Sequence, residues 1–411
     1  MRTIRFLLPV LLVSCFCYET RGQAEWPQWG GPSRDFISTS KGLAASWPEK
    51  GPRQLWSRPL GQGHSSIIVS GNTLYTMYSH GDQESVIALA ADTGQTIWEY
   101  KYDAPTAGMN YKEGFGPHST PLLIGDRLYT VGAIGMFLAL DAKTGKVVWS
   151  HDLWKEYNAT KRDRGYAASP LFFKGTIIIP VGGPGQAFMA FNPSDGSVVW
   201  KNQTLDASPS SPIIINVDGQ DQLVGFLGKQ IAGLDPNNGE LLWSHPHVTD
   251  WGLNISTPVW GSDNLLFVSS AYNGGSRVLR LSQAGGKTTV SELWFNNRMR
   301  IHHSTAIRIG EYVYGSSGDF GPAFFAGINV KTGEIAFQDR SFPKMSFVYA
   351  DGKLIIVDED GQLALATVSP AGLKVLSRFS LLRNLAWTVP TLVGTKLYVR
   401  DRQMIAALDL K

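Results

Sequence analysis

Short runs in which apolar and polar residues alternate, separated by tight turns, recur along most of the chain. Two of the clearest are STPLLIGDRLYTVG, which begins at Ser119, and STPVWGSDNLLFVSS, which begins at Ser256. Runs of this length joined by Gly, Asp or Asn are typical of two antiparallel β-strands connected by a tight turn. The pattern therefore predicts a series of β-hairpins.

A second phrase follows each of these hairpins. ALDAKTGKVVW, from Ala139, returns as AFNPSDGSVVW from Ala190 and as GLDPNNGELLW from Gly233, and ALAADTGQTIW begins at Ala88. The glycines of these phrases lie 43 to 51 residues apart. Each phrase supplies two more strands, and four antiparallel strands in a repeat of this length predict one blade of a β-propeller.

Eight repeats can be counted, and we expect their first strands to begin at Ser65, Ser119, Ala168, Ser210, Ser256, Ser304, Met345 and Thr388. The last repeat ends in MIAALDLK and lacks its fourth strand, whereas RQLWSRPL, around Trp56, has the character of that strand. We therefore expect an all-β fold over residues 25–411, a single-domain eight-bladed propeller of four-stranded antiparallel blades. An N-terminal strand closes the ring and so removes its unpaired edges.

The phrase that ends in tryptophan is expected to have a structural role. Gly145 suits a turn that needs a positive φ, and Asp141 can accept hydrogen bonds from backbone N–H groups of that turn. Trp149 is large enough to fill the gap between two blades, and its N–H can reach a carbonyl there. The residues assigned to such blade-to-blade docking are Trp56, Trp98, Asp141, Gly145, Trp149, Trp200, Trp243, Trp294 and Phe337.

Residues 1–24 have the pattern of an export signal rather than of the folded domain. Arg2 and Arg5 precede the apolar run FLLPVLLV, which is too short for an ordinary membrane helix. Cleavage after Ala24 would give a soluble protein, whereas processing at LVSC would leave a lipid anchor on Cys15. We favour the soluble form and leave the lipid-anchored form open; both predict an exported protein, periplasmic or extracellular, with no transmembrane segment.

Composition narrows the functional classes further. The chain is 43% hydrophobic and 17% charged, which is enough apolar material for a large core. Its two cysteines, Cys15 and Cys17, both lie in the predicted leader, so cleavage after Ala24 excludes disulfides, thiolate catalysis and cysteine-held metals or haem. The formal charge of +3 falls close to neutrality once the leader is removed, and no Lys/Arg run is present, so we expect no nucleic-acid binding.

The pattern A-x-D-x-x-T-G-x-x-x-W is complete in the second repeat, from Ala139 to Trp149. It is similar to the tryptophan-docking motif of the pyrrolo-quinoline quinone (PQQ)-like propeller repeat family, within the quinoprotein alcohol dehydrogenase-like superfamily. WPQWGGPSRD, from Trp26, also resembles the start of secreted planctomycete members. The resemblance covers essentially the whole mature chain and implies the propeller fold.

The resemblance leaves the chemistry open, because the family includes both enzymes and scaffolds. Its dehydrogenases bind PQQ with calcium or a lanthanide near the channel axis, and many use two adjacent disulfide-linked cysteines and an Asp base. This sequence has no such pair in its folded part, and no metal-ligand set can be placed by motif. The cofactor is therefore left unassigned: PQQ with calcium is not supported by site residues, and no metal site is predicted.

We expect any binding site on the propeller face that carries the long loops, where the channel opens. The residues just before the first strands include three of the eight histidines in the chain. With neighbouring loop residues they form a neutral-to-basic mouth suited to an anionic ligand, unless the histidines only bond the inner strands. The candidates are His64, His118, Arg164, Tyr166, Asn254, Arg300, His303, Lys344 and Trp387. His302 and His303 are not expected to share a metal, because adjacent strand residues point to opposite faces.

Three functions remain in competition. The favoured one is a non-catalytic binding or scaffold protein that is monomeric and holds a protein, a small anion or a glycan on its long-loop face. The chain is also shorter than typical members of the family and lacks their long insertions. The second is a PQQ-dependent alcohol dehydrogenase-like oxidoreductase, for which Asp319 is the one candidate metal ligand or base. The third is a carbohydrate-active propeller, based on loop aromatics such as Trp154, Tyr157 and Trp251. Whether the protein is an enzyme is left open.

Overall fold

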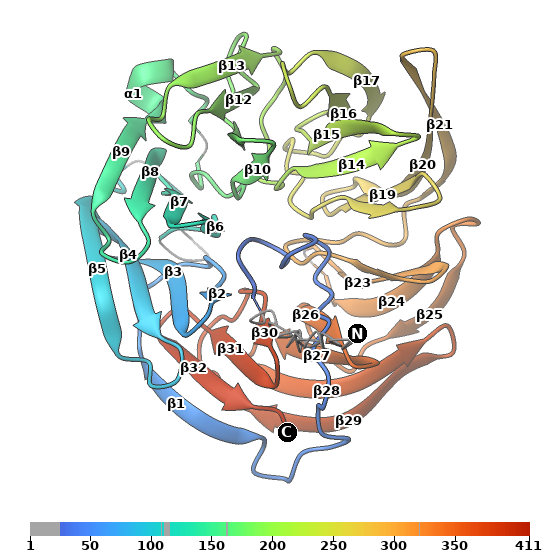
Figure 1. Cartoon of the computed structure of the whole chain (residues 1–411). Helices are drawn as coiled ribbons and strands as arrows, with labels where there is room; N and C mark the ends of the chain where they lie inside the picture. Colours follow the sequence, from blue (N-terminus) through green and yellow to red (C-terminus); the bar gives the residue numbers. More distant parts are fainter. Residues whose placement is uncertain (1–24, 108, 111–115, 162, 320) are drawn as a thin grey trace, which may run out of the picture.

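The strands of the described residues form eight four-stranded antiparallel sheets, arranged as blades around a channel (Figure 1). The computed structural model describes residues 25–107, 109–110, 116–161, 163–319 and 321–411. The blades are: blade 1, β2 (Ile68–Ser70), β3 (Thr73–His80), β4 (Gln83–Ala90) and β5 (Thr96–Asp103); blade 2, β6 (Leu122–Ile124), β7 (Arg127–Val131), β8 (Met136–Asp141) and β9 (Val147–Asp152); blade 3, β10 (Leu171–Phe173), β11 (Thr176–Pro180), β12 (Phe188–Phe191) and β13 (Val198–Asn202); blade 4, β14 (Ile213–Val217), β15 (Gln220–Phe226), β16 (Gln230–Leu234) and β17 (Leu241–Pro246); blade 5, β18 (Val259–Gly261), β19 (Leu265–Ser270), β20 (Gly275–Ala284) and β21 (Lys287–Asn296); blade 6, β22 (Ile307–Ile309), β23 (Tyr312–Ser317), β24 (Phe324–Asn329) and β25 (Ile335–Asp339); blade 7, β26 (Met345–Ala350), β27 (Lys353–Asp358), β28 (Gln362–Ser369) and β29 (Gly372–Ser380); and blade 8, β30 (Thr391–Val393), β31 (Lys396–Arg400) and β32 (Met404–Asp409) with β1 (Arg53–Pro59). The predicted fold class is confirmed.

The predicted leader, with Cys15 and Cys17, lies outside the described residues. Within them, the helical structure is α1 (Leu153–Tyr157), a short helix after β9 that begins at the N-cap Asp152. No helix of the described part of the chain has the length and apolarity needed to cross a membrane.

Strand β1 closes the ring as expected, by pairing antiparallel with β32 so that Trp56 lies opposite Ala407. The indole N–H of Trp56 donates to the carbonyl of Ala91 in blade 1 (2.8 Å). A second, unexpected clasp is the fully buried Arg400 of blade 8, which donates to the carbonyls of Met77 (2.6 Å) and Gly61 (3.0 Å). Blades 8 and 1 are therefore joined by a buried cation as well as by the closing strand.

The repeated phrase places every docking tryptophan except Trp243 against the glycine of the next blade. A Cβ added to Gly196, whose φ is +74°, would lie 2.8 Å from Cδ2 of Trp149, and Trp149 donates from Nε1 to the Pro193 carbonyl (3.0 Å). The indoles of Trp98, Trp200 and Trp294 donate to the next blade in the same way. Trp243 differs, because its N–H donates to Gln222 of its own blade (2.7 Å), and Phe337, which lacks an N–H, packs on Phe325 at 6.0 Å.

Within the turn of the second repeat, Asp141 accepts from both the backbone N–H (2.9 Å) and the hydroxyl (2.8 Å) of Thr144. Gly145 follows with a φ of +70°. A Cβ at Gly145 would lie 2.5 Å from Cε3 of Trp98. The glycine is therefore required twice over, for the backbone conformation and for the close approach of an indole.

The first strands begin later than expected in every blade except blade 7, where β26 begins at Met345 as predicted. In these seven blades the first strand begins three residues after the predicted position, for example at Leu122 rather than Ser119. In five of them it begins directly after a proline, which has no N–H to donate. The residues before these strands instead link the blades. Thr120 donates its backbone N–H to the Ser169 hydroxyl (3.0 Å), and Ser169 donates its own to the Ser211 hydroxyl (2.9 Å).

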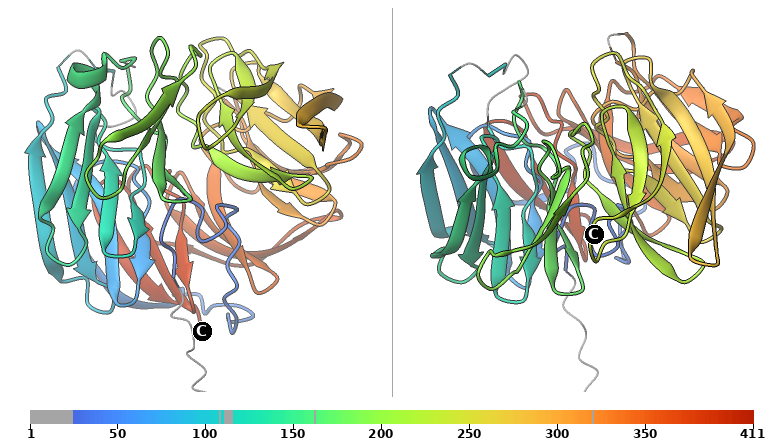
Figure 2. Two further views of the ribbon diagram at one scale, coloured as in Figure 1. Left: turned by 45° about the horizontal axis from the view of Figure 1, so that its top comes forward. Right: turned by 90° about the horizontal axis from the view of Figure 1, so that it is seen from above.

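Residues 26–47, which we call the strap, cross the channel on the side away from the long connections (Figure 2). The strap contacts blades on all sides of the ring. Its backbone pairs with Val69 of blade 1 and Tyr349 of blade 7, and the carbonyl of Pro27 accepts from Leu123 of blade 2 (2.9 Å). The indole of Trp29 donates to the Thr257 hydroxyl beside blade 5 (2.9 Å). The strap therefore links blades that lie on different sides of the channel.

Candidate functional site

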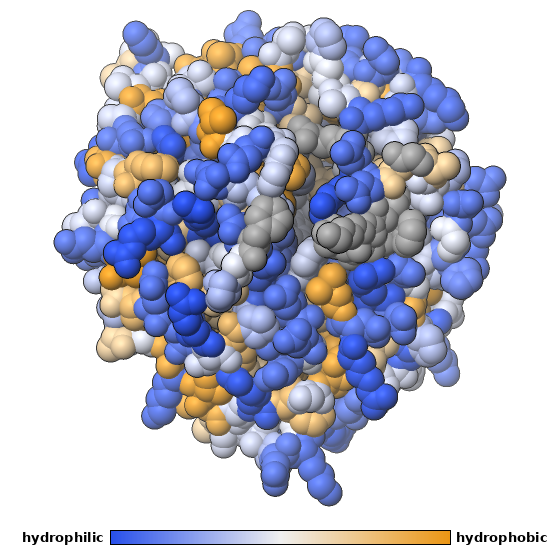
Figure 3. All heavy atoms as spheres, turned by 180° about the vertical axis from the view of Figure 1, so that it is seen from behind, coloured by the Kyte–Doolittle hydropathy of each residue, from blue (hydrophilic) through white to orange (hydrophobic). Residues whose placement is uncertain are grey.

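The face opposite the strap is hollowed at its centre and bordered mainly by hydrophilic residues (Figure 3). The longest connections of the ring, between β5 and β6 and between β9 and β10, end here. Because each first strand runs from this face along the channel, the residues just before those strands line the opening.

Trp387, just before blade 8, is the centre of a group of contacting rings in this opening. It stacks on His303 of the blade 6 connection, with ring centroids 4.5 Å apart, and contacts His64, which precedes blade 1, at 5.5 Å. His64 in turn stacks on His118, which precedes blade 2, at 5.3 Å. We call His64, His118, His302, His303 and Trp387 the mouth cluster.

The cluster extends to blade 5 through Tyr272. The hydroxyl of Tyr272 and Nε2 of His302 are hydrogen-bonded at 2.5 Å. On its other side, Tyr272 packs edge-on against Trp251 at 5.0 Å, and the Trp251 side chain is 58% exposed. A continuous row of rings therefore runs from the channel axis to an exposed indole at the rim.

Charged groups flank the cluster on several sides. Lys344 of the blade 7 connection lies with Nζ 5.9 Å from the Trp387 ring centroid, and Glu359 accepts from the Trp387 indole N–H (3.0 Å). Asp319 accepts from the backbone N–H of Tyr272 (3.2 Å) and lies 3.8 Å from Nη1 of Arg300. Asp319 is thus held by a backbone donor and a guanidinium.

Burial keeps three imidazoles of the cluster, those of His118, His302 and His303, neutral. It lowers the pKa of His118 to about 4, with a smaller contribution from the charge of Arg164. Burial, followed by the charges of Lys344 and Arg164, also lowers the pKa of His302 to about 4, against an opposing effect of Asp319. The pKa of His303 is held well below its usual value, mainly by burial. At neutral pH these rings are uncharged beside fixed cations.

The structure brings together His64, His118, Arg164, Arg300, His303, Lys344, Trp387 and Asp319 from the sequence-based candidates. Tyr166 and Asn254 lie elsewhere. The Tyr166 hydroxyl donates to the Val181 carbonyl (3.0 Å), between blades 2 and 3. Asn254 is fully buried and accepts from the Ser270 hydroxyl (2.5 Å), within a network of inner-strand serines.

Three residues of the site were not among the sequence-based candidates: His302, Tyr272 and Glu359. His302 and His303 precede β22 rather than belonging to it, so the alternation of strand side chains does not apply and their rings meet, with centroids 5.4 Å apart. Tyr272 and Glu359 lie in hairpin turns whose lengths differ between blades, which hides them from an alignment of repeats. For the glycan hypothesis, Trp154 and Tyr157 are half-buried rather than exposed.

The mouth does not fit PQQ with calcium. A quinone would need an open aromatic face, but the Trp387 indole already contacts His303, His64 and Lys344. Among the described residues, no group of three or more His, Asp or Glu side chains is arranged to hold a metal ion. The site as built offers an aromatic and imidazole surface with cationic neighbours.

Comparisons with known proteins agree with the fold. The family model described as outer membrane protein assembly factor BamB matches residues 82–339. BamB of Yersinia pestis is 23% identical over 306 residues, which cover 70% of this chain and 72% of that protein. Quinoprotein ethanol dehydrogenase of Pseudomonas putida is 30% identical over 207 residues, which cover 48% of this chain but only 26% of the dehydrogenase.

Among solved structures, quinohemoprotein alcohol dehydrogenase from Comamonas testosteroni superposes with a TM-score of 0.65 at 14% identity, covering 94% of this chain and 80% of that one. At this identity the likeness concerns the fold alone. The family model, in contrast, matches more than half of the sequence. The chain therefore belongs to the PQQ-like β-propeller family.

Proposed function

We propose that this chain is an exported, non-catalytic scaffold that binds a protein partner on its long-loop face, with the mouth cluster as the contact site. The observation that carries the proposal is the continuous row of rings from Trp387 to the exposed Trp251. Partly exposed aromatic side chains held by a rigid support are frequent anchors of protein interfaces. Val248, which is 64% exposed, adds apolar surface to the same connection between β17 and β18.

The acid–base properties of the mouth also support binding rather than catalysis. A general acid or base works best when its pKa lies near the working pH. With pKa values of about 4, His118 and His302 remain neutral at pH 7. Arg164, Arg300 and Lys344 favour a partner that presents carboxylates, because complementary charge guides and orients association.

The relatives support the same function. The match to a protein named for outer membrane protein assembly covers 72% of that protein, whereas the match to the dehydrogenase covers 26%. The leader pattern of residues 1–24 supports an exported location. A PQQ-dependent oxidoreductase is the alternative, supported by the dehydrogenase relatives and opposed by the ring contacts that occupy Trp387.

Site-specific photo-crosslinking in the native cells tests the proposal. A photoreactive benzoylphenylalanine replaces Trp251, and the matched control replaces Ile97, which is 50% exposed on the outer strand of blade 1. We expect a discrete protein adduct from position 251 that is absent from position 97 and that weakens when Arg300 is changed to Ala. Equal labelling at both positions would contradict a docking site on the long-loop face.

Titration of the purified protein with PQQ and calcium distinguishes the scaffold from a PQQ-dependent oxidoreductase. Binding is followed by tryptophan fluorescence and quinone absorbance. We expect no saturable binding up to about millimolar quinone. Saturable binding in the micromolar range, together with alcohol-dependent dye reduction, would favour the dehydrogenase instead.

A further inference from the structure

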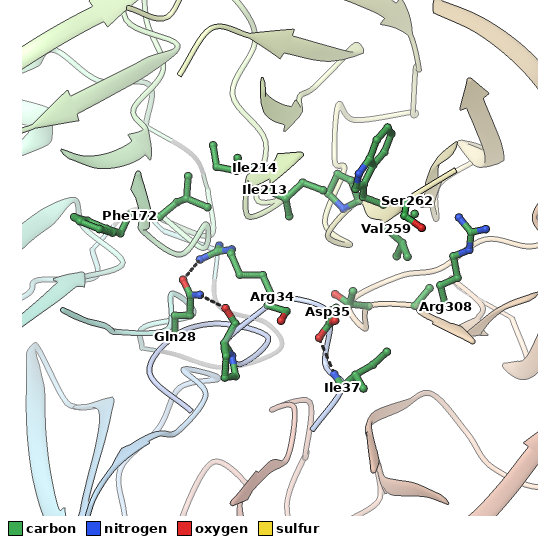
Figure 4. A pocket seen from close by; sticks show the side chains of 18 of the residues that line it. Gln28, Arg34, Asp35, Ile37, Phe172, Ile213, Ile214, Val259, Ser262 and Arg308 are labelled. Atoms are coloured by element: carbon green, nitrogen blue, oxygen red, sulfur yellow. Dashed lines mark hydrogen bonds between the residues drawn. The ribbon is translucent and has the colours of Figure 1, made fainter. Parts of the chain in front are cut away.

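A cavity of about 630 Å³ lies on the opposite side of the molecule, between the strap and the first strands of blades 3 to 6 (Figure 4). Ile213 and Ile214 of β14, Val259 of β18 and Phe172 of β10 give it apolar walls. The strap contributes Gln28 and Arg34. Small-molecule sites are typically concavities of about 300–1,000 Å³, mostly apolar, with a few convergent polar groups.

Arg34 is a buried charge that no carboxylate neutralises among the described residues. Its side chain is 8% exposed, and Nη1 donates to the Pro170 carbonyl (3.0 Å) and to Oε1 of Gln28 (3.2 Å). Its Nε and Nη2 atoms are buried and have no hydrogen-bond acceptor. Burial lowers the pKa of Arg34 to about 9, so the guanidinium remains charged at neutral pH.

The other charges of the cavity do not satisfy Arg34. Arg308 forms a two-pronged ion pair with Asp263, at 2.8 Å and 2.7 Å, and is neutralised by it. Asp35 is exposed at the cavity edge and accepts from the backbone N–H of Ile37 (3.0 Å). Figure 4 shows the Arg34 side chain extending towards Gln28, away from Asp35.

An unpaired buried guanidinium is costly, because burial removes its hydration and nothing replaces the missing acceptors. A hydrogen bond to the Pro170 carbonyl would need only a neutral donor, so that bond alone does not account for a buried positive charge at position 34. Arginine is instead the side chain best suited to hold a carboxylate, since it presents parallel N–H groups in a planar fork.

We propose that the cavity under the strap binds a small organic carboxylate, whose apolar body lies against Ile213 and Val259 and whose carboxylate accepts from Arg34. The Nε and Nη2 groups reach the anion after a rotation of the guanidinium out of its buried position. Because Arg34 belongs to the strap and Val259 to blade 5, the ligand also holds the strap to the ring. This site is separate from the mouth cluster and does not depend on the function proposed for it.

Calorimetric titration with octanoate and benzoate, each compared with its neutral amide, tests the proposal on the purified protein. We expect saturable binding of at least one acid, a higher unfolding temperature in its presence, and affinity at least about tenfold weaker for the matching amide. Failure of both acids to bind up to about 10 mM, or equal affinity for acid and amide, would overturn the proposal.

Two variants locate the site. Arg34→Gln removes the charge, and Val259→Phe fills the cavity without touching Arg34; each is expected to weaken acid binding by about tenfold or more. Arg383→Gln, at an exposed arginine, and Trp251→Ala, at the mouth, are the controls and should leave it unchanged. If Arg34→Gln does not fold, unchanged binding to Val259→Phe is sufficient to refute the assignment.

Discussion

The indole of Trp149 lies against Gly196 of the next blade so closely that a Cβ at position 196 would be 2.8 Å from the ring. The same glycine has a φ of +74°. Gly196→Ala is therefore expected to lower the free energy of unfolding by about 2–4 kcal/mol, through backbone strain and overpacking together. Urea unfolding of the purified variant measures the change.

Gly352→Ala is the matched control for Gly196→Ala. Gly352 has the same φ of +74°, but a Cβ there would meet nothing within 4 Å. Only the backbone strain of about 1–2 kcal/mol applies at this position. An equal loss of stability in the two variants would show that contact with the indole contributes nothing.

Trp149→Ala is expected to lower the free energy of unfolding by about 3–5 kcal/mol, because it removes a large buried aromatic side chain between two blades. Val148→Ala, one residue earlier on β9 at a side chain that is 42% exposed, should change it by no more than about 0.5 kcal/mol. Thermal and urea unfolding of both variants check this. A negligible effect of Trp149→Ala would refute the docking role.

Arg400→Met is expected to destabilise the protein by about 3 kcal/mol or more, since several buried carbonyls, including those of Ser65 and Met77, lose their donor. Arg383→Met, at an exposed arginine, provides the comparison and should have little effect. Because the clasp joins blades 8 and 1, hydrogen exchange is expected to rise first in β31, β32 and β3. Uniform exchange across the ring would argue against a local clasp.

Stability is expected to decrease as the pH falls from about 6.5 towards 4. His118 and His302 have folded pKa values of about 4, below the usual 6.5, so the unfolded chain binds protons in this range that the folded chain does not. Unfolding is then favoured by acid, on the order of 1 kcal/mol for each histidine. Urea unfolding of the wild type and of the double variant His118→Gln, His302→Gln at pH 7 and pH 5 checks this; equal slopes would contradict it.

The ring could be predicted because each blade repeats the same local sequence features. The turn glycine, the tryptophan four residues later and the strand alternation recur, so eight blades and the closing β1 could be inferred. In five blades the strand start was misplaced because the proline at Pro121 and its equivalents removes a donor that the serine pattern alone does not reveal.

The strap and the Arg400 clasp could not be predicted, because both include contacts between residues more than 130 positions apart, and none of their contacts leaves a periodic signal. The mouth was predictable in part. Equivalent positions in the repeats are occupied by His64, His118, His303 and Trp387. Because the blades are arranged symmetrically around the channel, equivalent positions lie at the same opening. Tyr272 and Glu359 reach it from turns that have no common length.

The segment from Trp26 to Pro59 binds early blades and also blades 7 and 8, which are made after all the others. It emerges from the ribosome well before its partners Tyr349 and β32, which lie about 300 or more residues further along the chain. Until then Trp26, Trp47 and Trp56 have no completed surface to cover them, and uncovered apolar segments favour aggregation. The nascent protein therefore remains an open array until blades 7 and 8 have been made, and it is most vulnerable to aggregation just before they appear.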